Sequence, residues 1–156
     1  MGGRAGAPGR PPAHGAPSAF PLWRPAPTLP TVGLTRTPPM PTTLPADARP
    51  AVEELRSIGG DELVREMMGT FIRFATAHVQ RLHEAAEHGD LEAGALIAHT
   101  LKTSARQLGA MLLGETCASA EAAARGGDGA GLLTWADAVA AAFDEAKGWM
   151  GSLAAD

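Results

Sequence analysis

Apolar residues recur at intervals of three and four from residue 47 onward, which is the spacing of one face of an α-helix. One such face runs through residues 61–88 and comprises Leu63, Met67, Phe71, Phe74, Val79, Leu82 and Ala86. A second runs through residues 90–109 and comprises Leu91, Ala95, Ala98, Leu101, Ala105 and Leu108. Residues 111–125 form an alanine-rich stretch, and the stretch after Asp128 repeats Leu132, Ala136, Val139, Phe143, Ala146, Met150 and Leu153. The pattern predicts four long amphipathic helices.

Glycine and aspartate residues mark the ends of these helices. Glycines at 59–60, 89, 109 and 126–127 interrupt the pattern, and Asp61 and Asp90 are suitable N-caps for the helices that follow. A shorter helix is expected over 47–57, with Val52, Leu55 and Ile58 packing as a lid. We therefore predict an all-α fold, an antiparallel up-down four-helix bundle with a short N-terminal lid helix, preceded by a disordered tail.

Composition divides the chain into two parts. All 13 prolines lie within residues 1–50, which carry five arginines and one aspartate for a net charge of +4. Residues 51–156 carry eight basic and 16 acidic side chains, for a net charge of −8. Residues 1–46 have few large apolar side chains, so burial cannot offset the entropy lost on ordering. We expect a disordered proline-rich tail over 1–46 and one folded domain over 47–156.

Charge and cysteine content exclude several classes of protein. An acidic folded part argues against nucleic acid as the main partner, because phosphate backbones require a positive surface. No apolar run approaches the roughly 20 residues that span a bilayer, and the N-terminus lacks a secretory signal. The single cysteine, Cys117, cannot form an intrachain disulfide and is expected to be buried. These features favour a cytoplasmic protein that binds neither membrane nor nucleic acid.

His99 has the most informative surroundings in the helical part. It lies about 100° around the predicted helix from Ala98 and therefore off the apolar face. Lys102 at i+3, Thr103 at i+4 and Arg106 at i+7 lie beside it on the outer face. Two fixed positive charges favour the neutral imidazole and attract an anion. A neutral nucleophile beside two cations is suited to phosphoryl transfer.

Around His99 the chain resembles the histidine phosphotransfer (HPt) family, small helical modules that relay phosphate between receiver domains in multistep two-component signalling. The resemblance covers residues 45–153. Family members carry His-x-x-Lys-Gly, usually followed by Ser, with a Leu-Gly pair further on; the matching residues here are His99, Lys102, Ser104, Leu108 and Gly109. Thr103 stands where the family usually has glycine, which leaves room for the partner to approach.

The resemblance implies roles for particular residues. His99 is expected to accept, through Nε2, the phosphoryl group of a receiver's aspartyl phosphate, with Mg²⁺ held by the receiver and no cofactor in this chain. Lys102 and Arg106 are expected to steady the phosphoryl oxygens. In aligned family members a Gln or Glu on the next helix hydrogen-bonds the imidazole, and Glu121 has that spacing.

The resemblance also implies the partners of the chain. These are response-regulator receiver domains and a hybrid histidine kinase, and the protein is expected to be a monomeric phosphocarrier. Nothing in the sequence resembles an ATP-binding loop, so no autokinase activity is expected.

Two alternatives remain open. With Thr103 in place of glycine, the same bundle is compatible with a non-catalytic adaptor that binds receivers without transferring phosphate. Residues 24–30 fit the Arg-x-x-Pro-x-x-Pro pattern of polyproline ligands, which is compatible with an interaction protein that acts through its tail.

Two further motifs are interpreted as structural. Residues 59–63 resemble the signature of diguanylate cyclases, but an amphipathic helix follows at once, so they predict only a helix start. His78, His83 and His88 recur every five residues, which scatters them around the helix, so no metal site is expected there.

Overall fold

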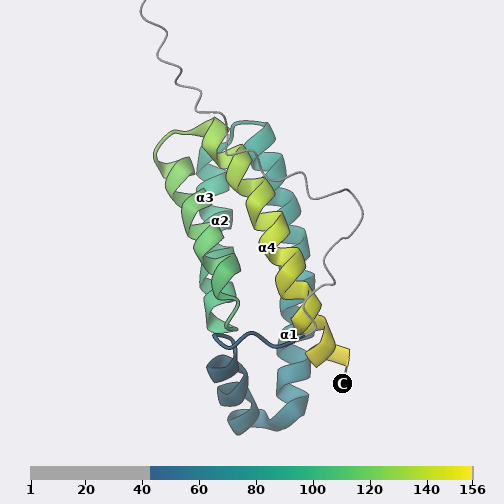
Figure 1. The fold of residues 1–156 in the computed structure, drawn as a ribbon. Coiled ribbons are helices and arrows are strands. Elements are labelled where there is room, and N and C mark those ends of the chain that lie inside the picture. The colour runs from purple at the N-terminus through teal and green to yellow at the C-terminus, as the bar shows by residue number, and fades with distance from the viewer. Residues whose placement is uncertain (1–42, 156) are drawn as a thin grey trace, which may run out of the picture. The chain divides into compact units, whose positions relative to one another are not determined.

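The computed structural model describes residues 43–155, which form four α-helices and no strand (Figure 1). The helices are α1 (Arg49–Glu87), α2 (Leu91–Gln107), α3 (Met111–Arg125) and α4 (Gly129–Ala155). Tight turns join consecutive helices, so neighbours in the sequence run in opposite directions. Helix α2 packs against α1 and α3, and α4 closes the bundle between α3 and α1. The predicted all-α up-down bundle is confirmed, whereas residues 1–42 of the predicted tail lie outside the described residues.

The lid helix, which we predicted over 47–57, is the first part of α1, residues 49–58, and it bends away from the rest of that helix at two glycines. Gly59 has φ −141° and ψ 17°, and Gly60 has φ 69° and ψ −167°. L side chains rarely adopt a positive φ, so glycine at position 60 permits the change of direction. The Asp61 carboxylate, expected as an N-cap, accepts a hydrogen bond from Arg56 Nε across the bend at 2.7 Å.

The lid packs against the bundle except at its end. Val52 is fully buried and Leu55 packs against the core. Ile58, which we predicted to pack with them, is 71% exposed, so this part of the prediction is wrong. The chain changes direction at the next residue, and no neighbouring helix covers that side of the lid.

The turn between α2 and α3 anchors the start of the lid. Ala48 is fully buried, and Gly109 has φ 80°. A Cβ atom at position 109 would lie 2.7 Å from Ala48 Cα, so both the backbone conformation and the close approach require glycine there. The Ala48 amide donates to the Pro45 carbonyl at 3.1 Å, and Leu44 packs against the core. The described fold therefore includes residues that precede the predicted boundary at 46.

The apolar faces of α2 and α4 are largely those predicted from the spacing. In α2, Ala98 and Leu101 are fully buried, and in α4, Leu132 and Val139 are fully buried. In α1 the predicted face is displaced at its start, because Val64 and Met68 are buried and not Leu63 and Met67.

The displacement in α1 has a local cause. Apolar residues stand side by side at positions 63–64 and 67–68, so their spacing alone admits two faces. Leu63 lies over the bend, where a Cβ atom at Gly59 would be 2.7 Å from Leu63 Cβ. Met67 is 37% exposed, which leaves the core positions to Val64 and Met68.

Polar side chains fix two of the helix starts, of which only the one at Asp90 was predicted. Asp90 Oδ1 accepts from the Ala93 amide at 3.0 Å, and Asp128 Oδ1 accepts from the Gly131 amide at 2.8 Å. Cys117 is fully buried, as expected, and burial raises the pKa of its thiol to about 12. Within residues 43–155, no helix is long and apolar enough to cross a membrane.

Candidate functional site

His99 lies on the outer face of α2, as the spacing predicts. Its side chain is 50% exposed, whereas Ala98 and Leu101 beside it are fully buried. The buried face of α2 holds the helix against the core, and the ring of His99 stands at the surface. A partner protein can therefore reach the imidazole without opening the bundle.

Glu121 reaches His99 from the neighbouring helix. Helices α2 and α3 are antiparallel and joined by a tight turn, so residues equally far from that turn lie side by side. The His99 Nδ1 and Glu121 Oε1 atoms are 3.0 Å apart. The side chain of Glu121 is only 8% exposed, so it lies beneath the imidazole and not in solvent.

The carboxylate of Glu121 contacts two cations in addition to His99. Lys102 Nζ lies 2.5 Å from Oε2, and Arg125 Nη2 lies 2.6 Å from Oε1. The side chain of Lys102 is 20% exposed and that of Arg125 is 64% exposed. We call His99, Lys102, Glu121 and Arg125 the His99 cluster. Its net charge is +1 when the imidazole is neutral.

Burial and the neighbouring cations act in opposite directions on Glu121. Burial disfavours the charged carboxylate and by itself raises its pKa. Hydrogen bonds from Lys102 and His99, together with the charges of Lys102 and Arg125, outweigh burial and hold the pKa of Glu121 below its usual value. Glu121 is therefore ionised at neutral pH.

An ionised carboxylate decides which nitrogen of the imidazole carries the proton. Because Glu121 accepts hydrogen bonds and donates none, the proton of a neutral His99 lies on Nδ1. Nε2 then holds the free lone pair. The arrangement presents a surface nucleophile with a fixed tautomer beside two cations, which is the chemistry required to accept a phosphoryl group.

The structure does not bring Arg106 into the His99 cluster, although the sequence spacing predicted Arg106 on the same face of α2 as His99. Arg106 Nη2 contacts Glu115 Oε1 at 2.7 Å. Its stem crosses α3 at Gly114, where an added Cβ atom would lie 2.7 Å from Arg106 Cγ. Because Gly114 has no side chain, the stem of Arg106 packs against α3 at this position, away from Glu121.

Comparison with protein families agrees with this geometry. The family model described as "Hpt domain" matches residues 66–149. The chain belongs to the Hpt domain family. No curated protein and no solved structure matches the chain. Hpt domains are helical bundles that act as phosphocarriers in histidine phosphotransfer, not as autokinases. The matched region of this Hpt domain contains the whole His99 cluster, and the lid precedes it.

Arg125 is a member of the His99 cluster that the sequence analysis missed. It stands at i+4 from Glu121, the spacing at which acidic and basic side chains meet on one helix. That signal was present in the sequence, but it does not show that the pair lies beside His99. The contact between α2 and α3 decides this.

Thr103, the departure from the family pattern, uses its hydroxyl on its own helix. Thr103 Oγ1 donates to the His99 carbonyl at 3.1 Å, one turn back along α2. The side chain is exposed. Its methyl group therefore adds bulk one turn along α2 from His99.

The other histidines of the described part have separate surroundings. His78 Nδ1 lies 2.9 Å from the Phe74 carbonyl, and His88 Nδ1 lies 2.7 Å from the Glu84 carbonyl. His83 lies near Glu87 and Asp137. Among residues 43–155, no group of three metal-binding side chains is assembled.

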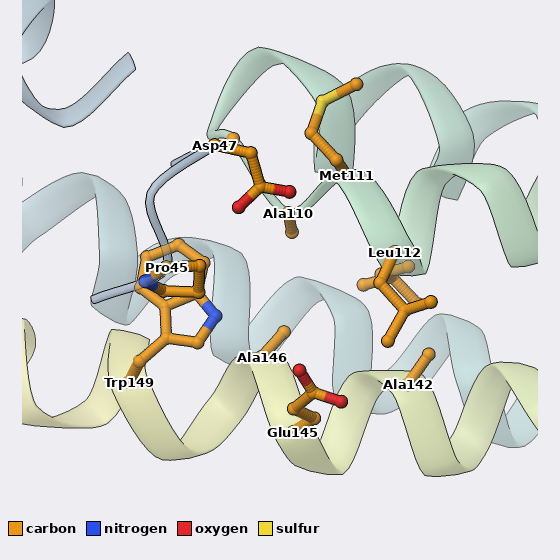
Figure 2. A pocket seen from close by; sticks show the side chains of 11 residues that line it. Pro45, Asp47, Ala110, Met111, Leu112, Ala142, Glu145, Ala146 and Trp149 are labelled. Carbon is orange, nitrogen blue, oxygen red and sulfur yellow. The ribbon is translucent and has the colours of Figure 1, made fainter. Parts of the chain in front are cut away.

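A small cavity lies between the start of the lid and helices α3 and α4, and Figure 2 shows the side chains around it. Its volume is about 60 Å³, and Asp47 and Glu145 lie on opposite sides of it. No member of the His99 cluster lines it. The surface site at His99 is therefore separate from this cavity.

Proposed function

We propose that His99 is the phospho-acceptor of this Hpt domain and that it relays a phosphoryl group to and from the aspartates of receiver domains. The observation that carries the proposal is the buried carboxylate of Glu121 at 3.0 Å from Nδ1 of a half-exposed imidazole. With the proton on Nδ1, Nε2 keeps a free lone pair for attack. The expected partners are response-regulator receivers and a hybrid histidine kinase.

Transfer requires positioning and charge neutralisation more than bond polarisation by the bundle. Nε2 attacks the phosphorus of the receiver's aspartyl phosphate, in line with the leaving carboxylate, while Mg²⁺ on the receiver neutralises the phosphoryl oxygens. Lys102 lies on the rim of the site and supplies a further positive charge. Arg106 lies farther along the same face and is bound to Glu115, so we assign it the weaker contribution.

The proposal extends to the state of the protein in the cell. We infer a monomeric phosphocarrier in the cytoplasm. The one cysteine of the sequence is buried, which is compatible with a reducing compartment. The competing function is an adaptor that occupies receivers without accepting phosphate, and the exposed Thr103 beside His99 favours it.

The deciding experiment is incubation of the chain with acetyl phosphate, a receiver and Mg²⁺, followed by detection of acid-labile, alkali-stable phosphate. We expect wild type to be labelled and His99→Gln to remain unlabelled. The substitution should leave the circular dichroism spectrum and Tm nearly unchanged, because the side chain is half exposed and does not pack in the core. Labelling of His99→Gln would contradict the assignment, and a receiver complex without labelling would favour the adaptor.

A further inference from the structure

The partner of His99 Nδ1 is a carboxylate, which accepts hydrogen bonds but donates none. Glu121 Oε1 lies 3.0 Å from Nδ1, and the Glu121 side chain is too buried to turn into solvent. An ionised carboxylate at this distance requires a proton on Nδ1 whether or not Nε2 carries a phosphoryl group. The contact therefore constrains the phosphorylated ring as well as the free one.

Resting on the proposed function of His99, we propose that Glu121 keeps the phosphorylated imidazole protonated on Nδ1, so that the phosphoryl group departs from a neutral imidazole. Glu121 is then a positioning residue that sets how readily the phosphohistidine gives up its phosphate. The site is arranged for rapid onward transfer and not for storage.

The bond changes balance without a proton transfer at His99. During loading, the lone pair of Nε2 forms the P–N bond while the bond between phosphorus and the aspartyl oxygen breaks, and its electron pair returns to the carboxylate. The ring, which already carries a proton on Nδ1, becomes a cation beside Glu121. During unloading, the P–N bond breaks, its electron pair returns to Nε2, and a new P–O bond forms to the next aspartate or to water. In hydrolysis the attacking water releases a proton to solvent.

A glutamine at the same position would not impose this state. Its amide has an oxygen that accepts and a nitrogen that donates, so it can bond to Nδ1 with or without a proton. If Nδ1 is unprotonated, the departing group is an imidazolide anion, which is a much poorer leaving group than neutral imidazole. The carboxylate and the amide have nearly the same shape, so Glu121→Gln changes this property with little change in packing.

The cations around Glu121 keep it charged. Lys102 Nζ and Arg125 Nη2 contact the two carboxylate oxygens at 2.5 and 2.6 Å. Burial opposes ionisation, but these contacts together with His99 hold the pKa of the carboxyl below its usual value. Glu121 therefore remains an acceptor across the neutral and alkaline range.

Helices α1, α2 and α3 carry the other titratable groups to be considered around His99. Lys102 and Arg106 lie on α2, and Arg125 lies on α3. On α1 the titratable residue as far from the connecting turn as His99 is His78, whose Nδ1 lies 2.9 Å from the Phe74 carbonyl. Helix α4 lies diagonally across the core from α2. His78 is therefore the second imidazole for which the experiment needs a control.

The experiment loads the full chain with phosphoramidate, a small nitrogen-bonded phosphoryl donor, and follows loss of phosphohistidine from about pH 6 to about pH 10. We expect the rate of phosphohistidine loss in wild type to stay constant up to a higher pH than in Glu121→Gln before it falls. In Glu121→Gln, the fall should begin about one pH unit lower, so that release between the two transitions is about tenfold slower.

Two control variants separate this effect from general electrostatics. Glu115→Gln removes one negative charge from an exposed position on the same helix, and we expect the wild-type profile. His78→Gln removes the imidazole at position 78 of α1, and we again expect the wild-type profile. A displaced profile in His78→Gln equal to that of Glu121→Gln would overturn the assignment to Glu121.

A measurement on unaltered protein does not depend on the folding of any variant. In ¹⁵N-labelled, phosphorylated wild type, the Nδ1 of His99 should show a protonated nitrogen resonance above neutral pH. An unprotonated Nδ1 at pH 8, or identical release profiles for wild type and Glu121→Gln, would overturn this inference and leave the phospho-acceptor assignment intact. Absence of phosphohistidine with both phosphoramidate and a phosphorylated receiver would instead contradict the proposed function.

Discussion

Lys102 is bound to Glu121, with its ammonium group 2.5 Å from Oε2. To contact a phosphoryl group on Nε2, it must share its hydrogen bonds between that group and the carboxylate. A cation held at the rim of the site is already oriented, so little reorganisation is needed as charge develops during transfer.

We therefore expect Lys102→Ala to slow phosphotransfer by about tenfold, which corresponds to ~1.4 kcal/mol of activation free energy. The measurement is the transfer rate from one phosphorylated receiver, with circular dichroism as a check on helicity. Arg106→Ala removes an equal charge from the same face of α2, but from an ion pair with Glu115, so we expect less than about a threefold effect. A larger loss in Arg106→Ala than in Lys102→Ala would reverse our ranking of the two cations.

We expect Thr103 to affect the approach of a receiver through its methyl group, since its hydroxyl is bonded to the His99 carbonyl at 3.1 Å. We expect Thr103→Gly to accelerate transfer or broaden the choice of receivers, at a stability cost of roughly 0.5–1 kcal/mol. Rates are to be compared at matched folded fractions, by stopped flow or gel.

Thr103→Ser provides the matched control at this position. It removes the methyl group and retains the hydroxyl that can donate to the backbone. If steric bulk is what limits transfer, the serine variant should recover part of the gain seen with glycine. A slower Thr103→Gly variant would show that the threonine side chain contributes a useful contact.

The lid depends on the turn that joins α2 to α3. Gly109 combines a φ of 80° with a close approach to Ala48, where an added Cβ atom would lie 2.7 Å from the Ala48 Cα atom. We expect Gly109→Ala to lower the free energy of unfolding by about 2–4 kcal/mol, because backbone strain and displacement of the lid add together.

Gly89 allows these two contributions to be separated. It has φ 68° but nothing within 4 Å of an added Cβ atom. Gly89→Ala should therefore cost only the conformational strain, about 1–2 kcal/mol by urea denaturation. Equal losses in the two variants would show that contact with the lid adds nothing to the requirement at position 109.

The folded part of the whole chain includes the residues immediately before α1, since Leu44 packs against the core and Pro45 accepts from the Ala48 amide. We expect deletion of residues 1–42 to shift Tm by less than about 2 °C and to leave transfer unchanged, because that segment has few apolar side chains to bury. Deletion of residues 1–46 should lower Tm by about 3–6 °C, as expected for the loss of ~1 kcal/mol. Differential scanning calorimetry of both truncations tests this boundary, and a large loss with the shorter deletion would contradict it.

The sequence by itself determined the elements of this protein and the position of its central residue. Helix-forming periodicity is local, so the four helices, their glycine and aspartate ends and the outward position of His99 follow from spacing alone. The resemblance to the HPt family then indicated Glu121 as the partner of the imidazole, and the structure places these two side chains in contact.

Tertiary structure decided what local spacing leaves open. Adjacent apolar residues in α1 allowed two faces, and the bend at Gly59 selected Val64 and Met68 for the core. Arg106 and Arg125 could not be assigned from one helix, because packing between α2 and α3 determines which cation reaches Glu121. Gly114 leaves space on α3 for the stem of Arg106, which meets Glu115, and Arg125 reaches Glu121. A charge cluster is assembled across helices, whereas periodicity records only the face of one helix.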